Sequence, residues 1–188
     1  MRRGCSVVEF LIESQRVRLR EWRESDVAML LPIGQDAAVR RFLGPLMTVD
    51  DVQELVDGQI LNQSIFGHCF WALERRSDHV LLGFCGINRG DTGTPLDGKI
   101  EIGWWLASQC WGQGYAREAA ELTLAWTWGN LLDDSVWSTT VQANERSSGL
   151  MKRLGMVYHP DLDFVHPAWR DFPHAFGADQ IYSIERPA

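Results

Sequence analysis

The sequence predicts a single α/β (α+β) domain, residues 1–188, in which a mixed central sheet carries helices on both faces. First, strand-like alternation and helix-like spacing follow one another in the order β-α-α-β-β-β-α-β-α-β-β, one short helix not counted. Second, 188 residues fit one domain and leave no room for another. Third, 45% hydrophobic and 23% charged residues give the balance of a globular protein and exclude a disordered chain.

The first third of the chain is predicted to hold one strand and three helices. Residues 15–22 alternate apolar and polar side chains, which is typical of a half-buried strand. A helix begins near Ser25, a plausible N-cap, and a short helix covers about residues 36–42. Another helix begins at Thr48, where Thr-Val-Asp-Asp suits a capping box.

The middle of the chain is predicted to be rich in strands. Residues 69–74 and 80–87 are apolar runs that a short polar segment separates, so they predict a hairpin. A loop rich in Gly, Pro and Asp covers residues 91–98, and a further strand covers residues 99–106.

The last part returns to alternating helices and strands. A helix is predicted at about residues 115–130, a strand of β-branched and aromatic residues at 136–141, and a helix at 144–154 that Gly155 ends. The remaining segments are predicted to be a short strand, an ordered loop and a closing strand: residues 156–158, 159–177 and 180–184.

The charge and the cysteines narrow the choice of partners. With 18 basic and 25 acidic residues the net charge is −7, whereas a nucleic-acid binder normally carries a basic excess. An acidic surface suits cationic partners, although it also serves solubility alone. Neither the four cysteines nor the five histidines have the spacing of a metal site, so no metal is expected. Without a signal peptide or a membrane-spanning segment, the expected location is the cytoplasm.

A glycine-rich turn after strand 99–106 carries the strongest functional signal. Gly112 and Gly114 stand at a strand–turn–helix junction, where unpaired N–H groups and the helix dipole favour a phosphate or pyrophosphate. No Lys-Ser/Thr follows Gly114, which excludes a P-loop, and Arg117 replaces the third glycine of a dinucleotide fingerprint. The alternative is a helix start whose glycines serve only a tight turn.

The residues around this turn extend the pattern. Gln109-x-x-Gly112-x-Gly114-Tyr115-Ala116 resembles the acetyl-coenzyme A motif of the GNAT N-acetyltransferases. The flanking residues resemble the RimJ/RimL type, whose named members acetylate the N-termini of ribosomal proteins. Four further segments match that type: Glu101-Ile102-Gly103-Trp104, Asn144-x-x-Ser147 with Lys152-Arg153-Leu154-Gly155-Met156, Arg18-Leu19-Arg20-Glu21-Trp22 and Arg41-Phe42-Leu43-Gly44. The resemblance covers about residues 15–186.

The resemblance implies a sheet that is splayed between strands 99–106 and 136–141, with coenzyme A in the opening. For the pantetheine arm the resemblance implies Trp104, Trp105 and Leu106. For the motif that includes the pyrophosphate-binding turn it implies Gln109, Trp111, Gly112, Gln113, Gly114, Tyr115 and Ala116. On the helix after strand 136–141 it implies Asn144 and Ser147. The sequence departs from the pattern in two places. Gln109 stands where many relatives have Arg, and Ser147 is followed by a second serine.

The predicted catalytic residues are Glu101 and Ser147. An amine attacks only when it is neutral, so a base is needed, and Glu101 faces away from the apolar side of its strand. Ser147 is the implied proton donor to the thiol sulfur. The alternatives are an edge glutamate and a solvent-facing serine, and Asn144 alternatively, or in addition, serves as an N-cap. Glu74 and Tyr115 are lesser candidates for the base.

The sequence therefore predicts an acetyl-CoA-dependent N-acetyltransferase that acetylates a primary amine directly. The amine belongs to a protein N-terminus, an amino acid or a small molecule, and we expect it to be cationic. The alternative function is a non-catalytic module that binds or senses coenzyme A on the same fold. Neither nucleic acid nor a membrane is an expected partner, and the oligomeric state is a monomer or a homodimer.

Overall fold

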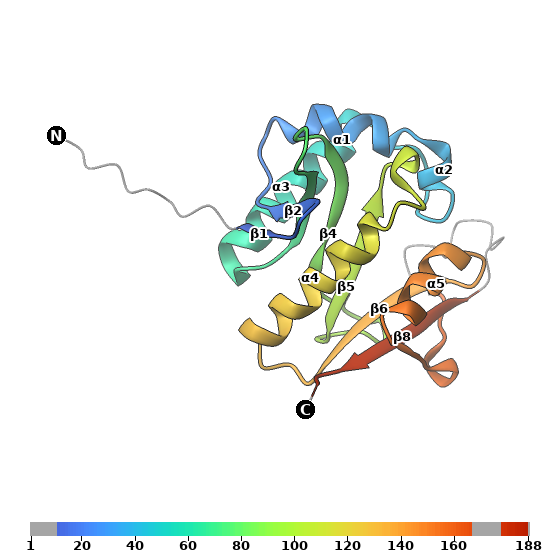
Figure 1. Ribbon diagram of the computed structural model, residues 1–188. Coiled ribbons are helices and arrows are strands. Elements are labelled where there is room, and N and C mark those ends of the chain that lie inside the picture. Colours follow the sequence, from blue (N-terminus) through green and yellow to red (C-terminus); the bar gives the residue numbers. More distant parts are fainter. Residues whose placement is uncertain (1–10, 167–177, 188) are drawn as a thin grey trace.

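The computed structural model describes residues 11–166 and 178–187, and its strands form one eight-stranded sheet in the order β1-β2-β3-β4-β5-β6-β8-β7 (Figure 1). The strands are β1 Leu11–Glu13, β2 Val17–Arg20, β3 Phe70–Arg75, β4 Leu81–Arg89, β5 Ile100–Leu106, β6 Ser135–Val141, β7 Val157–Tyr158 and β8 Asp179–Glu185. The α-helices are α1 Asp26–Gly34, α2 Ala37–Arg40, α3 Val49–Phe66, α4 Tyr115–Asn130 and α5 Glu145–Arg153. No helix within the described ranges is long and apolar enough to cross a membrane.

Helices cover both faces of this sheet, and Figure 1 shows α4 on the opposite side from α1 and α3. On one face, Gln59 of α3 accepts hydrogen bonds from Phe70 N and from Asn88 Nδ2 of β4. On the other face, Thr123 of α4 lies 3.6 Å from the Cys85 sulfur. The predicted mixed sheet with helices on both faces is therefore confirmed.

The sheet opens between β5 and β6, which are its parallel pair. β4 and β5 pair in register along seven residues, whereas β5 and β6 share the single register pair Glu101↔Trp137. Just past this pair, the Ser138 hydroxyl donates to Ile102 O at 2.9 Å. The two strands then diverge, which Figure 1 shows as a widening gap between the two ribbons. The predicted splay is therefore present.

The structure corrects two details at the ends of the chain. The predicted strand 15–22 is limited to Val17–Arg20 and forms a hairpin with β1, a strand too short for alternation to reveal. The predicted loop 159–177 begins with a 3-10 turn at Pro160–Leu162, and Phe164 forms an isolated bridge with Asp179. Residues 167–177 of that loop lie outside the described residues.

A buried ion cluster joins β2, α1 and β3. Arg20 makes two hydrogen bonds to the Asp26 carboxylate, at 2.7 and 2.9 Å, and a third to Glu74 at 2.8 Å. All three side chains are at most 5% exposed. A buried charge without its partner is strongly unfavourable, so the cluster fixes how these elements dock.

We expect Asp26→Ala to lower the free energy of unfolding by ~3–5 kcal/mol, because Arg20 would keep a buried charge with one partner fewer. Urea denaturation measures this. Glu121→Ala is the control, since the Arg117–Glu121 pair is more than half exposed and such pairs contribute at most ~1 kcal/mol. Equal losses in the two variants would contradict a structural role for the buried cluster.

Candidate active site

The glycine turn lies between the end of β5 and the start of α4. Gly112 and Gly114 have φ values of 74° and 83°, in the left-handed region that favours glycine. Gly114 is the N-cap of α4, and no side chain caps the helix. A Cβ at Gly112 would meet nothing within 4 Å, and one at Gly114 would meet only Arg16 Nη2 at 3.3 Å. The turn is therefore exposed and open in front.

The main-chain N–H groups of this turn are the best donors for an anion. Those of residues 112–117 donate to no atom within residues 11–166 and 178–187. Trp111 differs, because its N–H donates to Ser108 O at 3.1 Å. The free donors thus start at Gly112, whereas the predicted cofactor-binding residues of the motif also include Gln109 and Trp111. An uncapped start of a 16-residue helix suits phosphate oxygens, so the residues present fit the coenzyme A pyrophosphate.

Arg16 braces the turn from the β1–β2 hairpin. Its Nη1 donates to Gln113 O at 3.0 Å, its guanidinium lies over the Tyr115 ring, and its Nη2 pairs with Glu118 at 2.5 Å. Gln113 Nε2 also donates to Gln109 O at 2.8 Å. These contacts fix the carbonyl side of the turn and leave its N–H side open.

The pantetheine residues predicted on β5 differ in their surroundings. Trp104 is half-buried, whereas Trp105 and Leu106 are buried. Leu106 O accepts a hydrogen bond from Trp111 Nε1 at 2.9 Å. This bond holds the Trp111 ring, just before Gly112, against the end of β5.

The start of α5 brings the other two predicted residues to the diverging strand β6. Asn144 is the N-cap, and its Oδ1 accepts from Ser147 N at 3.3 Å. The Ser147 hydroxyl has no hydrogen-bond partner among the described residues and is half-buried. Ser148 is buried, and its hydroxyl donates back to Glu145 O at 3.4 Å. Of the two serines, Ser147 is the one with a hydroxyl available to a ligand.

Glu101 lies at the last paired position before β5 and β6 diverge, with Asn88 and Trp137 as its cross-strand neighbours. Burial, followed by the negative charges of Asp91 and Asp179, raises the pKa of Glu101 to about 7. A carboxyl with that pKa is half ionised near neutral pH and suits a general base. On this face of the strand Glu101 itself is half-buried, and Trp105, further along the same face, is 5% exposed.

Two carboxylates near Glu101 are joined through His166. The His166 main-chain N–H donates to Asp179 at 3.1 Å, and its Nε2 lies 3.2 Å from an Asp91 oxygen. Burial raises the pKa of Asp179, although the His166 hydrogen bond opposes that change. This side of the opening therefore carries two carboxylates besides Glu101.

Two buried side-chain atoms on the diverging parts of β5 and β6 have no hydrogen-bond partner in the described part of the chain. They are Trp105 Nε1 on β5 and Thr139 Oγ1 on β6. Sequence reasoning missed Thr139, because a threonine in a strand is ordinarily a packing residue. Buried polar atoms that lack a partner are unfavourable, which marks this region as one where a ligand or water completes the bonding.

The lesser base candidates lie elsewhere. Glu74 belongs to the buried ion cluster, where hydrogen bonds from Arg20 and His79 outweigh burial and hold its pKa below the usual range. Tyr115 begins α4, beneath the Arg16 guanidinium. Among the described residues, no group of three His, Cys, Asp or Glu side chains forms a metal site.

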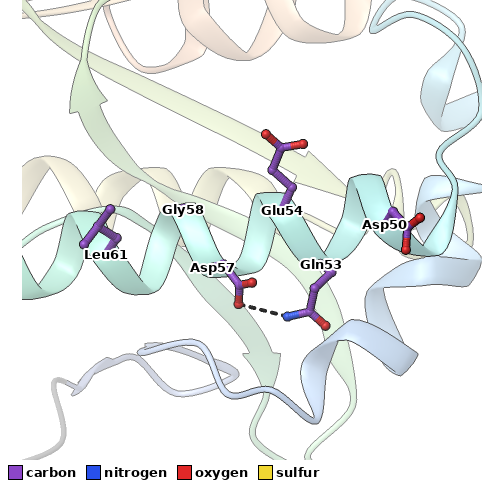
Figure 2. A pocket seen from close by; sticks show the side chains of 6 residues that line it. All are labelled: Asp50, Gln53, Glu54, Asp57, Gly58 and Leu61. Atoms are coloured by element: carbon purple, nitrogen blue, oxygen red, sulfur yellow. Dashed lines mark hydrogen bonds between the residues drawn. The ribbon is translucent and has the colours of Figure 1, made fainter.

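A surface pocket of about 460 Å³ lies along α3 and is separate from the glycine turn. Figure 2 shows its lining, with Gln53 donating to Asp57 at 2.9 Å, and the full set is Asp50, Gln53, Glu54, Asp57, Gly58 and Leu61. None of these residues belongs to β5, α4 or α5, so this pocket contributes nothing to the candidate site.

Known protein families and known proteins match the part of the chain that contains the candidate site. Residues 16–157 match the family model described as an acetyltransferase (GNAT) domain. The uncharacterized protein YkkB of Bacillus subtilis is 27% identical over 146 residues, which are 77% of this chain and 84% of that protein.

Solved structures match the fold along most of the chain. An acetyl transferase from Salmonella typhimurium, described as modifying the N-terminal serine of ribosomal protein L7/L12, aligns with a TM-score of 0.75 and 17% identity, over 94% of this chain and 99% of that one. RimL in complex with coenzyme A aligns with a TM-score of 0.77 and 15% identity, over 94% and 98%.

Proposed function

This chain belongs to the GNAT acetyltransferase family and is an acyltransferase, and we propose that it transfers an acetyl group from acetyl-coenzyme A directly to a primary amine. The observation that carries the proposal is the row of free N–H donors at residues 112–117, beside the point where β5 and β6 diverge. The coenzyme A complex of RimL supports the choice of cofactor.

Residues from two sides of the opening would hold coenzyme A. The N–H groups of residues 112–117 would take the pyrophosphate, the main chain of 104–106 would meet the pantetheine arm, and Asn144 would bond that arm from α5. When bound, the cofactor supplies a thioester whose carbonyl carbon accepts the amine. Gln109 is exposed and contributes its carbonyl to the turn.

The proton chemistry falls to Glu101 and Ser147. Glu101 would take the proton from the acceptor ammonium, because its pKa of about 7 leaves much of it ionised at neutral pH. Ser147 would donate its hydroxyl hydrogen toward the thiol sulfur. Direct transfer is supported by the three described cysteines, Cys69, Cys85 and Cys110, since burial raises the pKa of each thiol and keeps it a poor nucleophile.

The acceptor is a protein N-terminus, an amino acid or a small amine, and the Asp91–His166–Asp179 group favours one that is cationic. The RimJ/RimL type is supported by the Salmonella typhimurium neighbour, which is described as acting on a ribosomal protein. We place the reaction in the cytoplasm, where reduced cysteines such as the described three are usual. The acting unit is a monomer or a homodimer.

Release of the coenzyme A thiol, measured with a panel of peptides, amino acids and small amines, tests this function. At least one amine should accelerate release and appear as its N-acetyl derivative in mass spectra. Tight cofactor binding with no acceleration across the panel would favour the alternative, a non-catalytic module that binds or senses coenzyme A.

We expect Ser147→Ala to lower kcat by roughly 10–1000-fold with little change in the Kd for acetyl-coenzyme A, as for the loss of one acid–base group. Steady-state kinetics and calorimetry measure the two quantities. Ser148→Ala is the matched control and should keep nearly full kcat, because that hydroxyl donates to its own helix. An effect confined to KM would make Ser147 a binding residue, and a larger loss in Ser148→Ala would reverse the assignment.

A further inference from the structure

We propose that Arg146 contacts a phosphate group of coenzyme A from the α5 side of the opening, an inference that rests on the cofactor proposed above. The glycine turn itself carries no basic side chain, since residues 107–116 contain neither Lys nor Arg. Arg117, the last of the six N–H donors, pairs with Glu121 at 2.8 Å, so this segment offers no unpaired cation to a strongly anionic cofactor. A cation from another element would complete the site.

The position of Arg146 follows from Trp111. The Arg146 guanidinium carbon lies 4.8 Å from the centre of the Trp111 ring. That ring is fixed by its hydrogen bond to Leu106 O at 2.9 Å, and Gly112 follows it directly in the chain. The contact therefore joins α5 to the glycine turn across the diverging strands. A guanidinium that lies over a ring keeps its N–H edges available to oxyanions.

Arg146 differs from three other arginines in or near the turn. Arg16 pairs with Glu118 at 2.5 Å, Arg75 with Asp78 at 2.7 Å and Arg117 with Glu121 at 2.8 Å. Arg146 is exposed and has no carboxylate within 4.0 Å among residues 11–166 and 178–187. Of these four arginines, Arg146 is therefore the one whose charge no carboxylate of the described residues neutralises.

The position of Arg146 within α5 also favours an anionic ligand. α5 has Lys152 and Arg153 in its last turn, where the helix dipole favours cations. Arg146 lies in the first turn, where the dipole disfavours a cation and favours an anion. An anionic ligand at this end of α5 would relieve that repulsion and would use the dipole of the same helix.

Calorimetric titration of the full chain with coenzyme A tests the proposal. Arg146→Gln should raise the Kd about 10–100-fold, as expected for the loss of a charge-assisted hydrogen bond. The Kd of Arg146→Lys should lie between those of Arg146→Gln and the wild type, because lysine keeps the charge but lacks the planar guanidinium group. Arg153→Gln is the matched control, because it removes the same charge from the last turn of the same helix.

Truncated ligands identify the phosphate. If Arg146 binds the 3′-phosphate, dephospho-coenzyme A should have the same Kd for the wild type and for Arg146→Gln. If Arg146 binds the pyrophosphate, the difference in Kd between the two proteins should remain with dephospho-coenzyme A. Pantetheine, which has no phosphate, should not distinguish the two proteins. Equal losses in Arg146→Gln and Arg153→Gln, or no loss in either, would overturn the proposal. Absence of coenzyme A binding by the wild type would instead overturn the proposed function.

Discussion

Gly114→Asp should abolish measurable binding of acetyl-coenzyme A, with a loss of at least ~100-fold in affinity. The side chain would stand in the open space before the N–H groups of α4, where only Arg16 Nη2 lies within 4 Å of the new Cβ. Its negative charge would repel the pyrophosphate at the helix start, where the dipole favours a ligand anion. Loss of one charged contact alone accounts for ~10-fold or more, and the steric block adds to it.

Two controls separate charge from backbone strain. Gly114→Ala keeps the space almost open but places a Cβ at φ 83°, so it reports the strain alone. Gly114→Asn has nearly the shape of Asp without its charge. The expected order of affinity is wild type, Ala, Asn and Asp. Calorimetry that gave folded Gly114→Asp an unchanged Kd would contradict the cofactor assignment.

Glu101→Gln should lower kcat/KM by roughly 10²–10⁴-fold at pH 8, the range for removal of a general base. In the wild type, kcat/KM should rise with pH through about 7, because the pKa of Glu101 is raised to about 7 and the ionised form is the base. The variant should lose this limb. A pH–rate profile for the best acceptor measures both effects, and Glu54→Gln on the α3 surface is the control.

The same substitution should stabilise the fold, which a merely structural glutamate with satisfied hydrogen bonds would not do. The ordinary pKa of 4.5 is raised to about 7, so the carboxyl favours folding while protonated and loses that contribution as pH rises from about 4.5 to 7. Above pH 7 the free energy of unfolding of Glu101→Gln should exceed that of the wild type by up to ~3 kcal/mol, and near pH 4 the two values should be equal.

If the pH–rate profile of Glu101→Gln is the same as that of the wild type, the base is another group or water.

The sequence was sufficient to predict the elements whose signals are local. Alternation in residues 99–106 and the two glycines at 112 and 114 placed β5, the turn and α4 correctly, because strand period and positive φ depend on nearby residues. The strand β1 was missed, since three residues carry no period. Its place in the sheet depends on pairing with β2.

What sequence reasoning could not reach is the contact between distant segments. The sequence makes Glu74 a candidate base, but Arg20, 54 residues away, donates a hydrogen bond to it in the buried ion cluster. Arg146 and Trp111 meet only because α5 folds beside the glycine turn. Burial raises the pKa of Glu101, and Asp91 and Asp179, which are far apart in the sequence, raise it further. Such charges act through space, so no spacing along the chain reveals them.

The N–H groups of residues 112–117 are proposed to bind the phosphates of coenzyme A. Two-dimensional ¹H–¹⁵N NMR during a coenzyme A titration tests it most directly. The amide signals of Gly112 and Gly114 should move most, as hydrogen-bonded donors do, while Gly58 in the α3 pocket stays in place. Shifts centred on Gly58, or none at Gly112 and Gly114 at saturating coenzyme A, would contradict the claim.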